Sequence, residues 1–370
     1  MNGWEPCSVK HKRAAILTAV LALVTGIATC SVYAQTVQLP LVLVLSTGGT
    51  IAGKGASPTD LSNYKSGSFL GEEVVNAVPE IREVANVKVE QIVNVSSPDL
   101  TLADWLTLAN RINKIFADDP RVAGIVVTHG TNTLEETAYF LNLTVKDERP
   151  VVVVGSMRPG TAISADGPLN LLNAVRTVVS PEARGKGVLV VMNDEINGAR
   201  DVTKTNTYRV DTFRAPELGL LGYVNEDKVS FYHSSTRRHT VNSEFDISGI
   251  KTLPEVEILY SYVEPGTATI QALTTSGTKG IVFAGTGAGL LSSSEKSGLQ
   301  TILSMPPESR PVMVRSSRVG SGRVIARNDY DAMGMIPADT LSPQKARILL
   351  MLALTKTRDL KEIKRMFAEY

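Results

Sequence analysis

The 370-residue sequence has little cysteine, histidine or aromatic content. Its two cysteines, Cys7 and Cys30, lie in the first 30 residues, so a chain that loses this stretch has no thiol. That excludes a disulfide scaffold, a cysteine hydrolase and a cysteine-ligated metal centre. The net charge of +1 gives no electrostatic reason to expect nucleic acid or an anionic membrane as a partner. With 43% hydrophobic and 20% charged residues, the chain is neither disordered nor a polytopic membrane protein.

Residues 1–34 have the pattern of a signal peptide. A basic stretch, 10–13, precedes the uncharged, mostly apolar run 14–28, and the small residues of a cleavage site follow at 32–34. The apolar run is shorter than the roughly 20 residues of a membrane-spanning helix. A lipoprotein signal ending at Cys30 is an alternative, although threonine before the cysteine fits it poorly. Cleavage after Ala34 leaves 336 residues with 35 basic and 36 acidic side chains, because Lys10, Lys12, Arg13 and Glu5 are lost. We expect a periplasmic or secreted protein with no membrane association after this cleavage.

Short apolar runs alternate with helical patterns along the rest of the chain. The runs are rich in β-branched residues and lack polar alternation, which is typical of strands buried on both faces of a parallel sheet. They are 41–45, 124–127, 151–154 and 187–191. Apolar residues at helical spacing fall between them, at 102–116, 134–143 and 169–179, and Thr131-Asn132-Thr133 offers cap residues for the second helix. This order predicts an α/β fold.

A domain boundary is predicted near residues 233–254, a polar stretch without long apolar runs that is followed by Pro254. Strand-like runs resume at 256–263, 280–284 and 312–316, and two helical patterns close the chain at 344–354 and 360–370. We therefore expect a larger N-terminal domain over 37–232 with a parallel, flavodoxin-like sheet, a linker over 233–254, and a smaller C-terminal α/β domain over 255–370.

Two loops that follow predicted strands place threonines beside glycines. They are the segments 46–55 and 128–133. Ligands of open parallel sheets bind outside the carboxyl ends of the strands, so these loops are the candidate site. Glycine permits close backbone approach, and threonine supplies a hydroxyl group.

The main alternative for the first loop is phosphate binding, because Gly48 to Lys54 fits the beginning of a P-loop. That motif next requires Ser or Thr, but position 55 is glycine, and the following residues are poor helix formers. The second glycine loop, 285–289, misses the dinucleotide spacing because residue 290 is leucine. Nucleotide binding is therefore disfavoured.

The remaining chemistry is that of a hydroxyl nucleophile with a base other than histidine. Only His129, His233 and His239 lie beyond the leader, their spacing suggests no metal cluster, and no nucleophile elbow is present. His129 is more often a structural residue in such a loop. A lysine whose pKa is lowered by burial can act as the base, and the polar segment 200–207 offers Lys204, although a solvated loop is the simpler interpretation of that segment alone.

Together these segments resemble the bacterial-type L-asparaginase family, particularly its exported type II branch. The resemblance covers nearly all of residues 37–370. The matching segments, in order, are 47–53, 128–139, 164–168, 201–206 and 342–347. It implies hydrolysis of the side-chain amide of L-asparagine to L-aspartate and ammonia, with L-glutamine as a weaker substrate and without metal or cofactor.

The resemblance also implies roles for individual residues. Thr50 matches the nucleophile that forms an acyl-enzyme, and Tyr64 matches a tyrosine on a mobile loop that assists it. Thr131 and Lys204 match the second threonine and its lysine, which activate the attacking group, and Thr131 is also counted among the substrate-binding residues. Ser97 matches the serine that binds the substrate α-carboxylate.

Four positions depart from the family pattern. Asn132 stands where an aspartate usually contacts the substrate ammonium, and Pro98 replaces a Gln or Glu of the substrate-binding set. Ala288 replaces a polar residue of the Gly-x-Gly loop. The glutamate expected in the C-terminal domain has no clear counterpart, although Asn328, Asp329 and Asp331 lie nearby. These changes fall on the substrate-binding positions and leave the nucleophile and the lysine intact.

The resemblance further implies a homotetramer in which a neighbouring subunit completes the site. An exported amino-acid-binding protein that kept the fold and lost turnover is the alternative function. The retained Thr50, Tyr64, Thr131 and Lys204 argue against that alternative.

Overall fold

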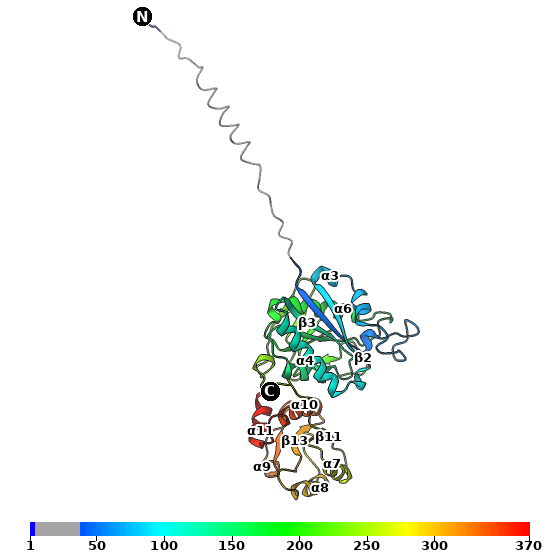
Figure 1. Cartoon of the computed structure of the whole chain (residues 1–370), viewed down its shortest axis with the longest axis vertical. Helices are drawn as coiled ribbons and strands as arrows, with labels where there is room; N and C mark the ends of the chain where they lie inside the picture. Colours follow the sequence, from blue (N-terminus) through cyan, green and yellow to red (C-terminus); the bar gives the residue numbers. More distant parts are fainter. Residues whose placement is uncertain (4–37) are drawn as a thin grey trace. The chain divides into compact units, whose positions relative to one another are not determined.

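The computed structural model describes residues 1–3 and 38–370. The expected signal peptide therefore lies outside the described residues, apart from its first three. Residues Leu39–Tyr370 form one structural unit with two larger sheets and a two-stranded one (Figure 1). In the described part of the chain, no helix has the length and apolar character needed to cross a membrane.

The larger sheet has eight strands in the order β10-β9-β6-β5-β4-β3-β1-β2. Its strands are β1 (Leu41–Gly48), β2 (Asn86–Val95), β3 (Val122–Thr128), β4 (Val151–Val154), β5 (Val188–Met192), β6 (Glu195–Gly198), β9 (Gly222–Val224) and β10 (Val229–Phe231). The five strands from β2 to β5 are parallel, and the other three add antiparallel pairs. The parallel part has the flavodoxin-like order 2-1-3-4-5, whose topological switch point lies between β1 and β3.

Helices cover both faces of this sheet. They are α2 (Gly71–Asn76), α3 (Ile81–Val84), α4 (Leu102–Asp118), α5 (Leu134–Thr144) and α6 (Gly167–Val179), with short 3-10 turns η1 (Thr50–Ala52), η2 (Ser97–Asp99) and η3 (Pro181–Ala183). Successive strand residues enter opposite cores: Val151 and Val153 pack with α4 and α5, whereas Val152 and Val154 pack with α2, α3 and α6. The uniformly apolar strand sequences thus reflect burial on both faces.

The second sheet is parallel, with the order β11-β12-β13-β14. Its elements are β11 (Val256–Tyr260), α7 (Ala268–Ser276), β12 (Gly280–Gly285), α8 (Ser293–Leu303), β13 (Val312–Ser317), α9 (Asn328–Asp331), β14 (Met335–Pro337), α10 (Pro343–Leu354) and α11 (Leu360–Glu369). One face packs on α7 and α8, and the other packs on α10 and α11. The predicted α/β fold with a larger and a smaller sheet is confirmed.

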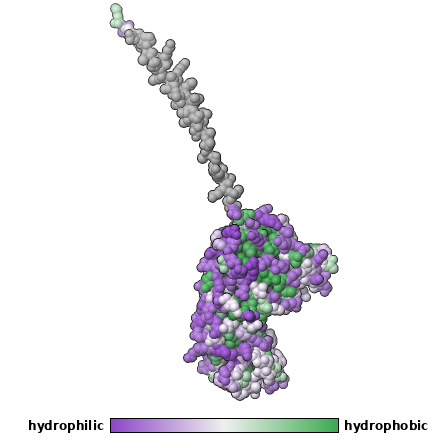
Figure 2. Space-filling view, in the orientation of Figure 1, coloured by the Kyte–Doolittle hydropathy of each residue, from purple (hydrophilic) through white to green (hydrophobic). Residues whose placement is uncertain are grey.

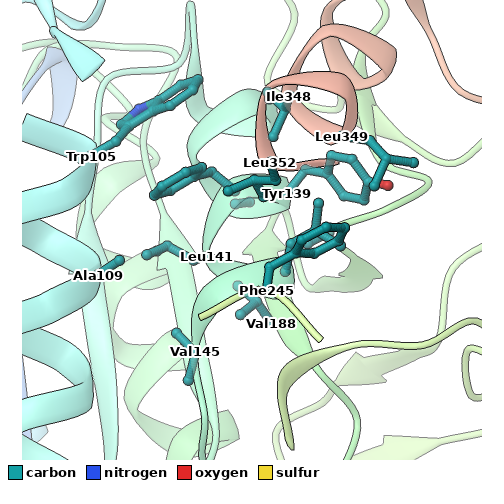
Figure 3. Close-up of a cluster of buried hydrophobic side chains, with 14 of the residues drawn as sticks. Trp105, Ala109, Tyr139, Leu141, Val145, Val188, Phe245, Ile348, Leu349 and Leu352 are labelled. Carbon is teal, nitrogen blue, oxygen red and sulfur yellow. The ribbon is translucent and has the colours of Figure 1, made fainter. Parts of the chain in front are cut away.

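Helix α10 joins the cores of the two sheets. Ile348, Leu349 and Leu352 lie in the same buried cluster as Tyr139 of α5 (Figure 3). The segment 233–254 has no strand and only the short turn η4 (Thr240–Asn242), yet Phe245 belongs to this cluster and is 1% exposed. On the face shown in Figure 2, hydrophilic residues border the apolar patches.

Candidate functional site

The site is built where the loops after β1 and β3 touch. Gly48 and Gly49 both have positive φ, 96° and 82°, which turns the chain sharply out of β1 into η1. A Cβ atom on Gly49 would lie 2.3 Å from the Cα and N atoms of Gly130. Only glycine fits this contact, because L side chains disfavour this conformation and the neighbouring atoms are backbone. The backbone contact brings Thr50 and Thr131 to the switch point of the sheet.

A third loop, after β2, completes this edge. Ser97 begins η2 and is 3% exposed, and a Cβ atom on Gly130 would lie 2.7 Å from its Oγ atom. The Asn132 N–H donates to Ser97 Oγ at 3.2 Å, and Thr133 Oγ1 donates to the Ser97 carbonyl at 2.8 Å. Thr133 is the N-cap of α5, but its hydroxyl does not cap the helix, so the predicted capping role is not observed. Pro98, the other predicted substrate-binding position, is exposed on η2.

Thr50 pairs with Tyr64. Their hydroxyl oxygens lie 2.7 Å apart, and Thr50 is 7% exposed whereas Tyr64 is half-buried. Two backbone hydrogen bonds of 3.0 Å between Lys54 and Lys65 close the loop that carries Tyr64. Gly53 leaves room for the tyrosine ring, since a Cβ atom there would lie 2.8 Å from Tyr64 Cδ2. The segment that resembled the beginning of a P-loop thus forms one 3-10 turn that faces a tyrosine.

Thr131 pairs with Lys204. The lysine Nζ atom donates to Thr131 Oγ1 at 2.9 Å and to Asn132 Oδ1 at 3.2 Å. Lys204 lies on β7 (Thr203–Lys204), which pairs with β8 (Phe213–Arg214) in a two-stranded sheet. Its half-buried ammonium is partly desolvated, which lowers the pKa of Lys204, and the charge of Glu135 opposes this shift. The segment 200–207 is therefore not a freely solvated loop, since it delivers Lys204 to the threonine.

His129 lies beneath this edge with no exposure to solvent. Desolvation lowers its pKa to about 4, against a smaller opposing effect of the Gly130 carbonyl, so the ring is neutral near pH 7. Its Nδ1 atom lies 2.7 Å from that carbonyl oxygen and must donate to it, because a carbonyl only accepts. His129 thus supports the loop from inside, as a structural residue does.

The predicted residues fall into two contacting groups. Thr50 and Tyr64 form one, and Ser97, Thr131, Asn132 and Lys204 form the other through the contacts above. Within the described residues, no group of three or more histidine, cysteine, aspartate or glutamate side chains could hold a metal ion. The sequence reasoning missed Glu135, which is 8% exposed and whose charge raises the pKa of Lys204. It also missed Lys345, which is 2% exposed and bonds the carbonyl of Val202, two residues before Lys204. The sequence signal that could have revealed both residues is a charged side chain among the apolar residues of a helix that is otherwise buried.

The C-terminal positions that departed from the family pattern are held within their own sheet region. Asp329 pairs with Lys296 at 3.2 Å, and Asp331 lies 3.6 Å from Lys364. Ala288 contributes its carbonyl, which accepts from Arg315 Nη1 at 3.0 Å. In this chain taken alone, the two aspartates are thus engaged by lysines of α8 and α11.

The fold and the site together define an α/β protein that gathers hydroxyl groups and a lysine at the switch point of its sheet, a set of groups suited to acyl transfer. The sequence matches the family "Asparaginase, N-terminal" over residues 41–237 and "Glutaminase/Asparaginase C-terminal domain" over residues 255–367. The chain belongs to the asparaginase family.

Individual relatives agree with this assignment. The chain is 50% identical to "L-asparaginase 2" of Bacillus subtilis, over 90% of this chain and 87% of that protein. It is 44% identical to the "Probable L-asparaginase periplasmic" of Haemophilus influenzae, over 94% and 99% of the two chains. Among solved structures it is similar to the probable cytoplasmic L-asparaginase from Campylobacter jejuni, with a TM-score of 0.86, 47% identity, and coverage of 90% of this chain and 100% of that one.

Proposed function

We propose that the protein hydrolyses the side-chain amide of L-asparagine to L-aspartate and ammonia through an acyl-enzyme on Thr50. The observation that carries this proposal is the pair of contacts at one sheet edge, Thr50 with Tyr64 at 2.7 Å and Thr131 with Lys204 at 2.9 Å. Each hydroxyl has a partner that can take up or return its proton, as nucleophilic catalysis without histidine requires.

The proposed reaction has two steps. Thr50 Oγ1 attacks the amide carbon, and its proton passes by way of the neighbouring Tyr64 hydroxyl to the amide nitrogen. The tetrahedral intermediate then collapses, the C–N bond breaks, and ammonia leaves with that proton. Neutral Lys204, acting through Thr131, then takes a proton from water, which attacks the ester and releases aspartate. We expect backbone N–H groups of the glycine loops, other than those of Gly49 and Gly53 that already donate to carbonyls, to stabilise the oxyanion, each contributing roughly 3–4 kcal/mol. Ser97 and Asn132 bind the α-carboxylate and α-ammonium of the substrate.

Ammonia release from L-asparagine and L-glutamine by the protein cleaved after Ala34 tests this proposal. We expect turnover of asparagine, weaker turnover of glutamine, and a loss of several orders of magnitude in kcat for Thr50→Ala with substrate binding largely retained. Thr107→Ala is the matched control, because that hydroxyl only bonds the Ala103 carbonyl within α4. Stalled reactions of the wild type should carry an aspartyl group on the peptide containing Thr50.

Two results would contradict the proposal. Near-normal turnover by Thr50→Ala would remove Thr50 as the nucleophile. Binding of asparagine without ammonia release by the wild type would instead favour an exported amino-acid-binding protein.

The proposal extends to assembly. We expect a homotetramer in which a neighbouring subunit completes the site. The edge strand β11 supports an interface, because Ile258 and Tyr260 on it are 36% and 56% exposed. Light scattering of the purified protein measures the assembly, and an active monomer would contradict it.

The proposal also places the mature protein in the periplasm or outside the cell. The leader pattern of residues 1–34 supports export, and one relative is named periplasmic while a structural neighbour is titled cytoplasmic. N-terminal sequencing of the protein from cell fractions decides the matter, and we expect the exported form to begin at Gln35. An uncleaved chain confined to the cytoplasm would contradict export.

A further inference from the structure

The first turn of α10 contains a lysine that is buried against the chain leading to Lys204. Lys345 is 2% exposed, and its Nζ atom donates to the carbonyl oxygens of Ala199 at 3.0 Å, Arg200 at 2.9 Å, and Val202. An ammonium group has three donors, and here all three bond to backbone. The three carbonyls belong to the turn between β6 and β7, so Lys345 fixes the turn from which β7 begins.

The position of this turn sets the position of the Lys204 backbone, from which its side chain reaches Thr131. Val202 lies two residues before Lys204, and its carbonyl is the last of the three acceptors. β7 itself has only two residues and pairs with one short strand, β8. Such a short ladder constrains the backbone weakly, so the contact with α10 supplies much of the constraint. α10 is rigidly held, because its apolar face lies in the buried cluster with α5 (Figure 3).

A buried carboxylate of α5 is bonded to the same helical turn. Glu135 lies in the first turn of α5 and is 8% exposed, and its Oε1 atom accepts from Gln344 Nε2 at 3.0 Å. Its Oε2 atom is buried, and the described residues offer it no hydrogen-bond partner. The carboxylate favours the charged form of both Lys204 and Lys345.

We propose that Lys345 and Glu135 are positioning residues for Lys204: Lys345 holds the backbone that aims its amine at Thr131, and Glu135, the buried carboxylate bonded to Gln344 of the same helical turn, supplies the opposing charge. This inference rests on the proposed role of Lys204 as the group that activates the attacking water. The C-terminal region thereby acts on the chemistry of its own subunit from beneath the site.

The charges around the two lysines determine in which direction Glu135 shifts the pKa of Lys204. Lys204 is faced by Glu135 alone among the groups that affect its pKa besides burial. Burial lowers the pKa of Lys345 to about 8, while Glu135, Asp201 and Glu136 raise it and Arg200 lowers it. Removing the charge of Glu135 therefore lowers the pKa of Lys204, and the neutral amine becomes available at lower pH.

Kinetics of three variants separate the two roles. In Lys345→Met we expect kcat to fall roughly 100-fold, the scale of an ångström-size misplacement of a reacting group, with KM changed less than about twofold. Lys345→Arg keeps the donors and should restore part of kcat. In Glu135→Gln, which keeps the acceptor for Gln344, the acid limb of the kcat profile should move to lower pH.

The matched control is Lys146→Met. Lys146 is a half-buried lysine whose Nζ atom also donates to a carbonyl, that of Ser243 at 2.7 Å, and Ser243 lies outside the turn before Lys204. Its loss should lower the melting temperature without changing kcat or the pH profile. An unchanged kcat in folded Lys345→Met, or equal kinetic losses in the control, would overturn the positioning role.

A measurement that does not depend on turnover tests the electrostatic role of Glu135 separately. The pH dependence of Lys204 modification by an amine-reactive reagent, followed by mass spectrometry, should have a lower midpoint in Glu135→Gln than in the wild type. An unchanged midpoint would overturn the electrostatic part even if Lys345→Met does not fold. A wild type that releases no ammonia would instead refute the proposed function, so the two failures are distinguishable.

Discussion

Asn132→Asp places a carboxylate beside Lys204 and tests two opposing consequences of one charge. Asn132 Oδ1 lies 3.2 Å from Lys204 Nζ, and Asn132 is exposed to solvent. Two unit charges at that distance interact by about 1.3 kcal/mol at the dielectric constant of water, which is roughly a tenfold change in an equilibrium. The ammonium form of Lys204 is stabilised by that amount, so about tenfold less neutral amine is available on the acid side of its titration.

The same carboxylate also faces the α-ammonium of the substrate. Exchanging a neutral hydrogen bond for a charged one contributes about 1–1.5 kcal/mol, or roughly tenfold in affinity. We therefore expect KM for L-asparagine to fall while the acid limb of the kcat profile moves to higher pH. Both effects should shrink with added salt, because position 132 is exposed.

The assay is steady-state ammonia release as a function of pH at two ionic strengths. Asn132→Ala is the control, since it removes the amide without adding charge and should leave the acid limb at or below its wild-type pH. An Asn132→Asp protein with an unchanged KM would show that another group already pairs with the substrate ammonium. An unmoved acid limb would show that Lys204 is not the group that titrates.

Two further predictions concern stability. Gly49→Ala should lower the free energy of unfolding by about 3 kcal/mol, because a Cβ at φ 82° would lie 2.3 Å from Gly130 backbone atoms. Urea titration measures this loss, and Gly219→Ala is the control, because Gly219 has positive φ but open space around it. Equal losses of stability in the two variants would refute the close contact. Burial lowers the pKa of the His129 imidazole to about 4 in the folded chain from about 6.5 in the unfolded one, so the unfolded chain binds the extra proton between these pH values. The free energy of unfolding should therefore fall by about 3 kcal/mol as the pH drops from 6.5 to 4, and a His129→Gln chain with the same slope over that range would contradict the assignment.

The sequence predicts the interior of the larger sheet well and its margins poorly. The runs that became β1, β3, β4 and β5 are uniformly apolar, since both faces are buried. β2 was not predicted, because it is an edge strand with exposed Asn86, Lys88 and Gln91 along it. The antiparallel strands β6, β9 and β10 are too short to show a period.

The candidate site was accessible to sequence reasoning only in part. Thr50 and Thr131 stand beside glycines at strand ends, which is a local signal. Tyr64 emerged only from the resemblance, and Lys204 was a candidate base in a segment whose simpler interpretation was a solvated loop. Lys345 acts on carbonyls about 145 residues earlier in the chain, and such a pairing exists only after α10 has packed on α5. Long-range contacts of this kind leave no mark on local periodicity.

The shared helix α10 limits how this chain can be recombined with its relatives. Its residues Ile348, Leu349 and Leu352 complete the core that begins with Tyr139 of α5, so each sheet region depends on the other for one of its two cores. A chimera that takes residues up to 254 from one parent and the remainder from another would combine two half-cores that were never fitted together. The packed faces of α5 and α10 therefore have to come from the same parent. A junction in the segment between the two sheets separates these two helices, although it breaks no strand.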